Sequence, residues 1–130
     1  MKKQAIICVD DDKAVLETLE EQLERLFGDK YIYEVAESGQ EALDLIEDLV
    51  TEGYAPVTVI SDWSMPGMKG DEFLTQLHGR YDGVVKILLS GQAPEEAIER
   101  AYKFAKLDHY IQKPWKMDDL KKKLSNINIA

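Results

Sequence analysis

The chain has 130 residues, a length typical of one domain, and 45% of them are hydrophobic, enough for a substantial core. Its formal net charge of −9 argues against direct binding to nucleic acid or to an anionic membrane, because both require a basic surface. No apolar run approaches the roughly 20 residues of a membrane span, and the single cysteine, Cys8, excludes an internal disulfide. We therefore expect one domain over residues 1–130, located in the reducing cytoplasm.

The first two strands and helices are predicted to follow one another without long linkers. An apolar run at residues 4–9 predicts a buried strand, and an aspartate triplet follows it. Leucines then recur at helical spacing as far as Gly28, a residue type that favours the end of a helix. Residues 31–36 predict a second strand. Ser38, with a glutamate three residues later, is typical of the start of a second helix.

The second half of the chain repeats this alternation, and two of its strands run directly into polar residues, Asp62 and Ser90. Pro56 is expected to precede the third strand, and Pro94 to lie in the first turn of a helix. The predicted elements are a third strand at 57–61, a helix at 71–77, a fourth strand at 84–89, a helix from Pro94, a fifth strand at 109–112, and a final helix from about Asp118 that includes Ile127.

Five alternations of strand and helix predict an α/β fold. We expect a five-stranded parallel sheet with helices on both faces and the flavodoxin-like strand order 2-1-3-4-5. In that order the carboxyl ends of the first, third, fourth and fifth strands meet at one edge, where ligands bind in such sheets. The polar residues expected to share this cleft are Asp10, Asp11, Asp62, Ser90 and Lys113.

The chemistry of this set points to a metal and a phosphoryl group. Two carboxylates ~5 Å apart repel by about 3 kcal/mol at an effective dielectric constant of ~20, so a cation would stabilise the cluster. Oxygen ligands without histidine or cysteine suit Mg²⁺, which also binds substrate phosphate. Asp62 would be the nucleophile that accepts the phosphoryl group, and Lys113 would balance its charge. The Ser90 hydroxyl could donate to a phosphate oxygen, and Gly91 leaves room for the group to enter.

Each feature alone has an ordinary structural explanation. An aspartate triplet at a helix start is commonly a solvated cap, and an aspartate before a Pro-Gly turn commonly forms an Asx-turn. A Ser-Gly or Lys-Pro pair alone indicates little. Their joint occurrence at matching strand ends is what favours a functional site.

With these residues in place, the chain resembles the response-regulator receiver domains of two-component signalling over essentially its whole length. The resemblance is carried by Val9-Asp10-Asp11, the strand ending in Asp62, the segment Met65-Pro66-Gly67-Met68-Lys69-Gly70, Ser90-Gly91, Tyr110 and Lys113-Pro114. The chain departs from the family pattern at Trp115, where phenylalanine is more common. It also has Lys-Leu-Asp where Gly-Ala usually precedes the fifth strand.

The resemblance implies a phosphoprotein with Asp62 as phosphoacceptor and Mg²⁺ held by Asp10, Asp11, Asp62 and the backbone carbonyl of Ser64. It implies that Ser90 is the switch hydroxyl, that Tyr110 is the switch aromatic, and that Gly91 and Lys113 lie at the phosphate. It further implies that the side chains of Ser64 and Gln92 tune dephosphorylation and that the Lys113-Pro114 bond is cis, a form that X-Pro bonds accept. Such a domain is not an enzyme beyond catalysing its own phosphorylation and dephosphorylation.

The resemblance also implies partners. A histidine kinase or histidine phosphotransfer protein would supply the phosphoryl group. An output domain or downstream protein would bind the face made by the fourth helix, fifth strand and last helix, and phosphorylation could drive homodimerisation. The sequence does not specify the cognate kinase, the output, the oligomeric state, the acyl-phosphate lifetime, or whether the chain is part of a longer protein.

Two alternatives of other classes stay open at this point. A strand followed by Asp10-Asp11-Asp12 also fits the Asp-x-Asp nucleophile motif of haloacid-dehalogenase-like phosphatases, with Asp10 as nucleophile. Such enzymes need a later acidic pair, for which only Asp118 and Asp119 remain. The second alternative is an interaction module on the same fold that works without phosphorylation.

Overall fold

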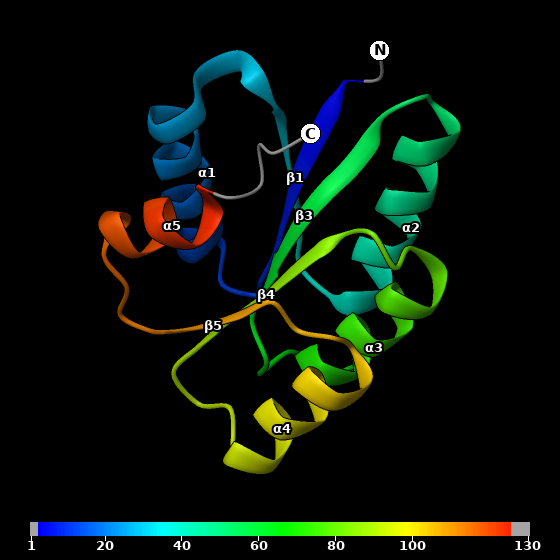
Figure 1. The fold of residues 1–130 in the computed structure, drawn as a ribbon, viewed down its shortest axis with the longest axis vertical. Coiled ribbons are helices and arrows are strands. Elements are labelled where there is room, and N and C mark those ends of the chain that lie inside the picture. Colours follow the sequence, from blue (N-terminus) through cyan, green and yellow to red (C-terminus); the bar gives the residue numbers. More distant parts are fainter. Residues whose placement is uncertain (1–2, 126–130) are drawn as a thin grey trace.

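The computed structural model describes residues 3–125, and within them a five-stranded parallel sheet forms the centre of the molecule (Figure 1). The strand order is β2-β1-β3-β4-β5, so the predicted flavodoxin-like order 2-1-3-4-5 is confirmed. The strands are β1 (Gln4–Val9), β2 (Ile32–Ala36), β3 (Ala55–Ser61), β4 (Val85–Ser90) and β5 (His109–Gln112).

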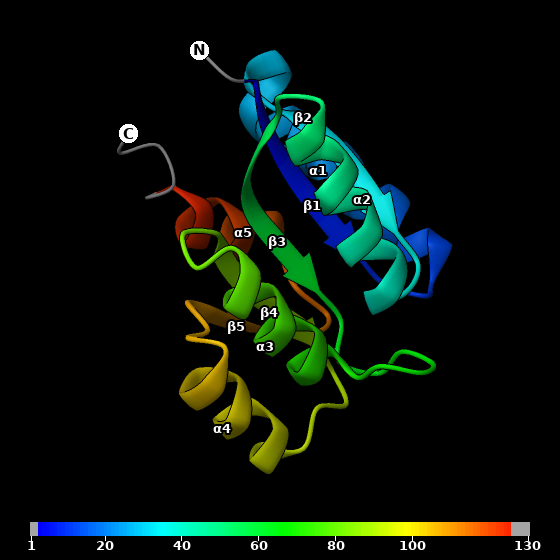
Figure 2. The ribbon, with the colours of Figure 1, turned by 90° about the vertical axis from the view of Figure 1, so that its right-hand side faces the viewer.

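Helices cover both faces of this sheet. In Figure 1, α1 and α5 lie on one side, and α2, α3 and α4 lie on the other, where Figure 2 shows them side by side. Two apolar clusters fill the layers between helices and sheet, the first containing Leu19 and Leu120, the second Ile46, Phe73 and Ala101. The helices are α1 (Lys13–Phe27), α2 (Gly39–Thr51), α3 (Gly70–Arg80), α4 (Glu95–Phe104) and α5 (Met117–Leu124), with a 3-10 turn at Gly28–Lys30.

Local capping explains where the first two helices begin and where the first one ends. The Asp12 carboxylate accepts a hydrogen bond from the Ala14 backbone N–H at 3.0 Å, and the Ser38 hydroxyl accepts one from Glu41 at 3.1 Å. Both bonds satisfy N–H groups that have no partner inside their own helix. Gly28 ends α1 with φ of 59°, a left-handed conformation that favours glycine.

Several predicted boundaries are wrong by a few residues. Pro56 lies inside β3 rather than before it, and Tyr31 lies just outside β2. α3 continues three residues beyond Leu77, and Pro94 is the N-cap of α4 rather than part of its first turn. The final helix begins one residue before Asp118, and Ile127 lies outside the described residues.

β3 contains an irregularity that accommodates its proline. Ala5 of β1 pairs with Pro56, and the next residue, Ile6, pairs with Thr58, so Val57 has no partner in β1. An extra residue of this kind is a β-bulge, where a missing proline N–H is tolerated within a sheet. From Thr58 onward β3 pairs regularly with both neighbours as far as Ser61.

Cys8 is buried in the sheet, and burial raises the pKa of its thiol to about 12, so the group behaves as a small apolar side chain. Among the helices of residues 3–125, none combines the length and the apolar character needed to span a membrane.

Candidate functional site

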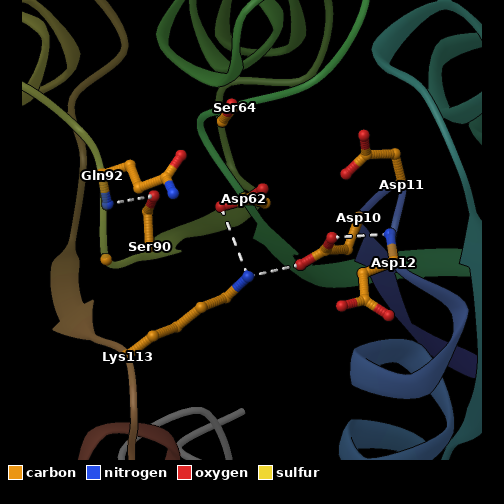
Figure 3. Close-up of a pocket in the computed structure, with 9 residues that line it drawn as sticks. Asp10, Asp11, Asp12, Asp62, Ser64, Ser90, Gln92 and Lys113 are labelled. Carbon is orange, nitrogen blue, oxygen red and sulfur yellow. Dashed lines mark hydrogen bonds and ion pairs between the residues drawn. The ribbon is translucent and has the colours of Figure 1, made fainter.

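A cleft of about 430 Å³ opens at the carboxyl edge of the sheet. Four strands supply residues to it, because β1 is followed by Asp10, β3 by Asp62 and β5 by Lys113, while β4 ends at Ser90 (Figure 3). The structure thus brings together the polar residues that the sequence placed at these strand ends. The cleft is lined by Asp10, Asp11, Asp12, Asp62, Ser64, Ser90, Gly91, Gln92 and Lys113.

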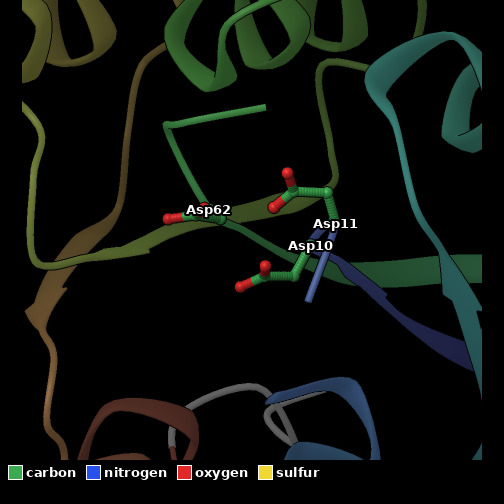
Figure 4. A group of neighbouring side chains, drawn as sticks. All are labelled: Asp10, Asp11 and Asp62. Atoms are coloured by element: carbon green, nitrogen blue, oxygen red, sulfur yellow. The ribbon is translucent and has the colours of Figure 1, made fainter. Parts of the chain in front are cut away.

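Three carboxylates form the acidic part of the cleft. Oxygen atoms of Asp10, Asp11 and Asp62 lie within 4.8 Å of one another (Figure 4). Asp10 and Asp62 are buried, at 2% and 7% exposure, while Asp11 is exposed. Carboxylates this close repel one another, so the cluster is an electrostatically strained arrangement that a cation would relieve.

The sheet itself fixes the two buried carboxylates. The Asp10 backbone N–H donates to the Ala36 carbonyl at 3.1 Å, and the Asp62 N–H donates to the Val9 carbonyl at 2.9 Å. These bonds continue the parallel ladders one residue beyond β1 and β3. Both aspartates are therefore held on rigid main chain rather than on a free loop.

Lys113 extends across the cleft from the end of β5 and contacts two of the carboxylates (Figure 3). Its Nζ lies 2.8 Å from Asp10 Oδ2 and 3.5 Å from Asp62 Oδ1. Burial alone would lower the pKa of Lys113, but its bond to Asp10 and the two negative charges outweigh burial and raise that pKa. The lysine is therefore a stable cation at the centre of the cleft.

Asp10 is engaged through both of its carboxylate oxygens. Oδ1 accepts from the Asp12 backbone N–H at 2.9 Å, and Oδ2 accepts from Lys113. Burial, reinforced by the charge of Asp62, raises the pKa of Asp10 above its ordinary value even though these two donors oppose the shift. Asp11 is the exposed member of the three carboxylates.

The opposite wall of the cleft is formed by the turn after β4. The Gln92 backbone N–H donates to the Ser90 hydroxyl oxygen at 3.3 Å, and the Gln92 side chain extends toward Asp62 (Figure 3). A Cβ at Gly91 would meet Lys113 atoms at 3.5 Å, an ordinary contact distance. The structure therefore gives no steric reason for glycine at position 91.

Tyr110 differs from the other sequence candidates because it does not line the cleft. It lies on β5 beside a separate hollow that Pro114 and Lys123 also line. Its hydroxyl donates to the Ser90 backbone carbonyl at 2.9 Å, so Tyr110 contacts the main chain of a residue that lines the cleft. The Lys113-Pro114 bond is cis, as expected.

One set of interactions near Asp62 was missed by the sequence interpretation. The Trp63 indole Nε1 donates to Asp71 Oδ1 at 2.7 Å, and Asp71 Oδ2 accepts from Arg100 Nε at 3.0 Å. The residues come from the β3–α3 loop, α3 and α4, and no short-range sequence pattern connects them. Asp12, the remaining lining residue outside the prediction, has its carboxylate occupied as the α1 cap.

The site has the chemistry of a metal and phosphoryl site. Its cluster offers only carboxylate oxygens, which Mg²⁺ prefers, and one of these aspartates faces solvent, where the ion keeps its waters. A lysine beside the cluster places a positive charge 3.5 Å from Asp62 Oδ1. Fold and cleft together define a doubly wound α/β domain with an acidic site at its strand ends.

The chain belongs to the response regulator receiver domain family, whose model matches residues 6–125. Receiver domains of this family bind Mg²⁺ at an acidic pocket and serve two-component signalling rather than enzymatic turnover. The chain is 33% identical over 119 residues to the hydrogenase transcriptional regulatory protein HoxA of Cupriavidus necator, covering 91% of this chain and 23% of that protein. It is 34% identical over 116 residues to the response regulator MprA of Mycolicibacterium vanbaalenii, covering 88% and 46%. The chain thus spans less than half the length of these relatives.

Solved structures show the same fold. A receiver domain protein from Methanospirillum hungatei, described as CheY-like, has a TM-score of 0.83 and 32% identity over 96% of this chain and 92% of its own. The signal receiver domain of an HD domain-containing protein from Pseudomonas fluorescens has a TM-score of 0.85 and 26% identity, covering 98% and 88%.

Proposed function

We propose that this chain acts as a single receiver domain over residues 1–130 and that Asp62 accepts the phosphoryl group. The observation that carries the proposal is the position of Lys113, whose ammonium lies within 3.5 Å of Asp62 and 2.8 Å of Asp10. One cation thus faces both the proposed acceptor and the proposed metal cluster. We further propose that the domain functions in the cytoplasm.

In this proposal Asp10, Asp11, Asp62 and the backbone carbonyl of Ser64 hold Mg²⁺. The fit rests on the oxygen-only donor set and on the 4.8 Å grouping of the three carboxylates. When bound, the ion would neutralise the carboxylate cluster and the charge of the incoming phosphoryl group. Asp10, with both oxygens already engaged, would contribute mainly through water, and Asp11 directly.

The protein's own residues would then perform the transfer. A carboxylate oxygen of Asp62 attacks the phosphorus of a phosphohistidine, the P–O bond forms, and the P–N bond breaks with its electron pair passing to the imidazole. Lys113 balances charge on one phosphoryl oxygen, and the Ser90 hydroxyl donates to another. Gly91 lies beside Ser90 at the mouth. In dephosphorylation a water oxygen attacks the phosphorus of the acyl phosphate, the bond to the Asp62 oxygen breaks, and inorganic phosphate leaves as the Asp62 carboxylate is restored. The domain thereby catalyses its own phosphorylation and dephosphorylation.

Ser90 and Tyr110 would transmit the conformational change from the cleft to the α4–β5–α5 face. Drawing the Ser90 hydroxyl toward the phosphoryl group would disturb the turn whose carbonyl now accepts the Tyr110 hydroxyl bond. Tyr110 would then change position, shifting the face made by α4, β5 and α5. If NMR spectra of the phosphorylated protein showed unchanged resonances for Tyr110 and these helices, this coupling would be wrong.

Membership of the receiver family supports the following partners. A histidine kinase or histidine phosphotransfer protein would dock over the cleft and supply the phosphoryl group. The α4–β5–α5 face would bind an output domain or a downstream protein, or a second copy of the chain in a phosphorylation-linked dimer. Direct binding to nucleic acid or membrane does not fit the net charge of −9.

The phosphatase alternative is not favoured. Its later acidic pair would have to be Asp118 and Asp119, but the Asp119 carboxylate accepts the Lys116 backbone N–H at 3.0 Å at the start of α5. Neither aspartate lines the cleft. The complete set of cleft residues also argues against a module that works without phosphorylation.

The test is phosphorylation by a small phosphodonor with and without Mg²⁺, followed by intact-protein mass spectrometry. Wild-type protein should gain one phosphoryl group only with Mg²⁺, and Asp62→Asn should gain none. Asp44→Asn is the matched control, because Asp44 is exposed on α2 away from the cleft and its loss of charge should leave the reaction intact. Trp63, next to Asp62, gives a fluorescence readout of Mg²⁺ binding. Turnover of a phosphate ester that is lost in Asp10→Asn but kept in Asp62→Asn would instead establish a phosphatase.

A further inference from the structure

A buried carboxylate connects the residue after Asp62 to α4. Asp71, at 8% exposure, accepts the Trp63 indole N–H at 2.7 Å through one oxygen. Its other oxygen accepts Arg100 Nε at 3.0 Å, and Arg100 is about half exposed on α4. Both bonds are charge-assisted, and such bonds are about twice as strong as neutral ones. Asp71 therefore holds two elements at once.

Asp71 is itself fixed relative to Asp62. The Gly70 backbone N–H donates to the Trp63 carbonyl at 2.9 Å, and a Cβ at position 70 would overlap the Asp62 carbonyl oxygen. The start of α3 thus lies directly against the main chain of the proposed acceptor.

The Trp63 ring is held from a second direction. The Lys69 ammonium lies 5.1 Å from the centre of the indole, a cation–π distance. Trp63 is thus fixed by Lys69 over its face and by Asp71 at its edge. A displacement of the main chain at Asp62 and Trp63 is therefore transmitted to the Asp71 carboxylate rather than absorbed by a free side chain.

This connection is separate from the residues that perform the proposed chemistry. Trp63, Asp71 and Arg100 do not line the cleft. They lie on the β3–α3 loop, α3 and α4 rather than on the Ser90–Tyr110 route through β4 and β5. The bonds belong to an arrangement in which Lys113 still contacts Asp10. They therefore hold α4 and Trp63 in this arrangement of the cleft.

We propose that Asp71 is a positioning residue that ties α4 to the phosphoacceptor strand through Arg100 and Trp63, and that this tie opposes the shift to the phosphorylated state. The inference rests on the proposed function of Asp62. By linkage, weakening a contact that stabilises the phosphoryl-free state must tighten binding of a phosphoryl group or its mimic. The contacts of Asp71 act in addition to the route through Ser90 and Tyr110. They determine how large a free-energy change at Asp62 is needed to move α4.

The experiment measures the affinity for beryllofluoride, a phosphoryl mimic, in the presence of Mg²⁺. Arg100→Gln removes the guanidinium charge that pairs with Asp71, and Arg100 does not line the cleft. Arg25→Gln is the matched control, since Arg25 forms an exposed pair with Glu21 on α1. Arg100→Gln should bind the mimic about threefold more tightly or better, a change typical of residues that modulate coupling, and Arg25→Gln should match wild type. Arg100→Lys, which restores the charge, should lie between wild type and Arg100→Gln.

NMR of the two indole N–H groups supplies a signature that a general loss of stability would not produce. The Trp63 signal is assigned by its loss in Trp63→Phe. Arg100→Gln should shift the Trp63 signal and leave the Trp115 signal, whose indole donates to Gln22, in place. An unshifted Trp63 signal, or unchanged or weaker affinity in Arg100→Gln, overturns the tie while the proposed function stands. If wild type binds Mg²⁺ but not beryllofluoride, the proposed function fails and the coupling fails with it.

Discussion

The ammonium of Lys113 lies closer to Asp10, at 2.8 Å, than to Asp62, at 3.5 Å. The lysine therefore neutralises the proposed metal-binding side of the cleft more strongly than the proposed acceptor. A cation bound at the carboxylates would compete with Lys113 for Asp10. Its arrival would release the lysine toward the phosphoryl oxygens. The metal ion would then neutralise the carboxylates, and Lys113 would neutralise the phosphoryl group.

Lys113→Ala is expected to bind Mg²⁺ more tightly than wild type, by about tenfold, because it removes a competing positive charge beside Asp10. The same variant should be phosphorylated at least about tenfold more slowly, because no ammonium balances the incoming charge. Titration of Trp63 fluorescence with Mg²⁺ and time-resolved mass spectrometry measure the two effects. Lys121→Ala, on the exposed face of α5, is the control. Weaker Mg²⁺ binding in Lys113→Ala would contradict this account.

Gln92→Ala is expected to slow loss of the acyl phosphate by about tenfold, since the Gln92 side chain extends toward Asp62 and could position an attacking water (Figure 3). Ser64→Ala should also change this rate, while leaving the backbone carbonyl that is proposed to bind the metal. Mg²⁺ affinity should stay near the wild-type value in both variants. Decay of the phosphorylated mass after removal of the donor gives the rate. A change confined to Mg²⁺ affinity would reject this role.

Gly70→Ala is expected to destabilise the protein by about 1–3 kcal/mol, because the new Cβ would overlap backbone atoms of Asp62 and Trp63 that cannot move freely. Gly79→Ala, in the same helix, is the matched control, as a Cβ there meets no atom within 4 Å. It should stabilise α3 by about 0.5–1 kcal/mol. Urea unfolding of the three proteins measures both changes. Equal effects of the two substitutions would show that the close approach at Gly70 is unimportant.

Lys86→Met is expected to raise the free energy of unfolding at neutral pH by about 1 kcal/mol. Lys86 is buried at 2% exposure, and its ammonium donates to the Val84 carbonyl at 2.7 Å. Burial lowers the pKa of Lys86 below its usual 10.5, although Asp108 and Asp82 oppose the shift. Between the lowered pKa of Lys86 in the folded state and 10.5 in the unfolded state, the folded state binds fewer protons than the unfolded state. The destabilising effect of the Lys86 charge therefore disappears as the pH rises from the lowered pKa to 10.5.

The advantage of Lys86→Met over wild type should accordingly shrink as the pH approaches 10.5. Urea unfolding at a series of pH values measures the difference between the two proteins, which removes the contributions of other groups. Lys121→Met serves as an exposed control and should show no such trend. A constant or growing advantage at alkaline pH would contradict the lowered pKa.

The α/β class could be predicted because the apolar runs and helical periodicities alternate cleanly, and the strand order is the common flavodoxin-like one for five such units. The cleft followed from that order, since the carboxyl ends of adjacent parallel strands must meet. The position of Pro56 inside β3 could not be predicted, because it depends on the bulge at Val57, which is a property of the pairing with β1. The Arg100–Asp71 contact joins residues 29 positions apart, and only the packing of α4 on α3 brings them together.

Val57 lies on the amino-terminal side of every residue pair that joins β3 to β4. A residue gained or lost between α2 and Val57 can be absorbed at the bulge, whereas one between Thr58 and Asp62 would turn the acceptor to the other face of the sheet. A change in the α2–β3 connection is thus not expected to alter the orientation of Asp62 at the other end of β3. We expect this connection to accept a change in length, or an inserted reporter, without loss of the cleft.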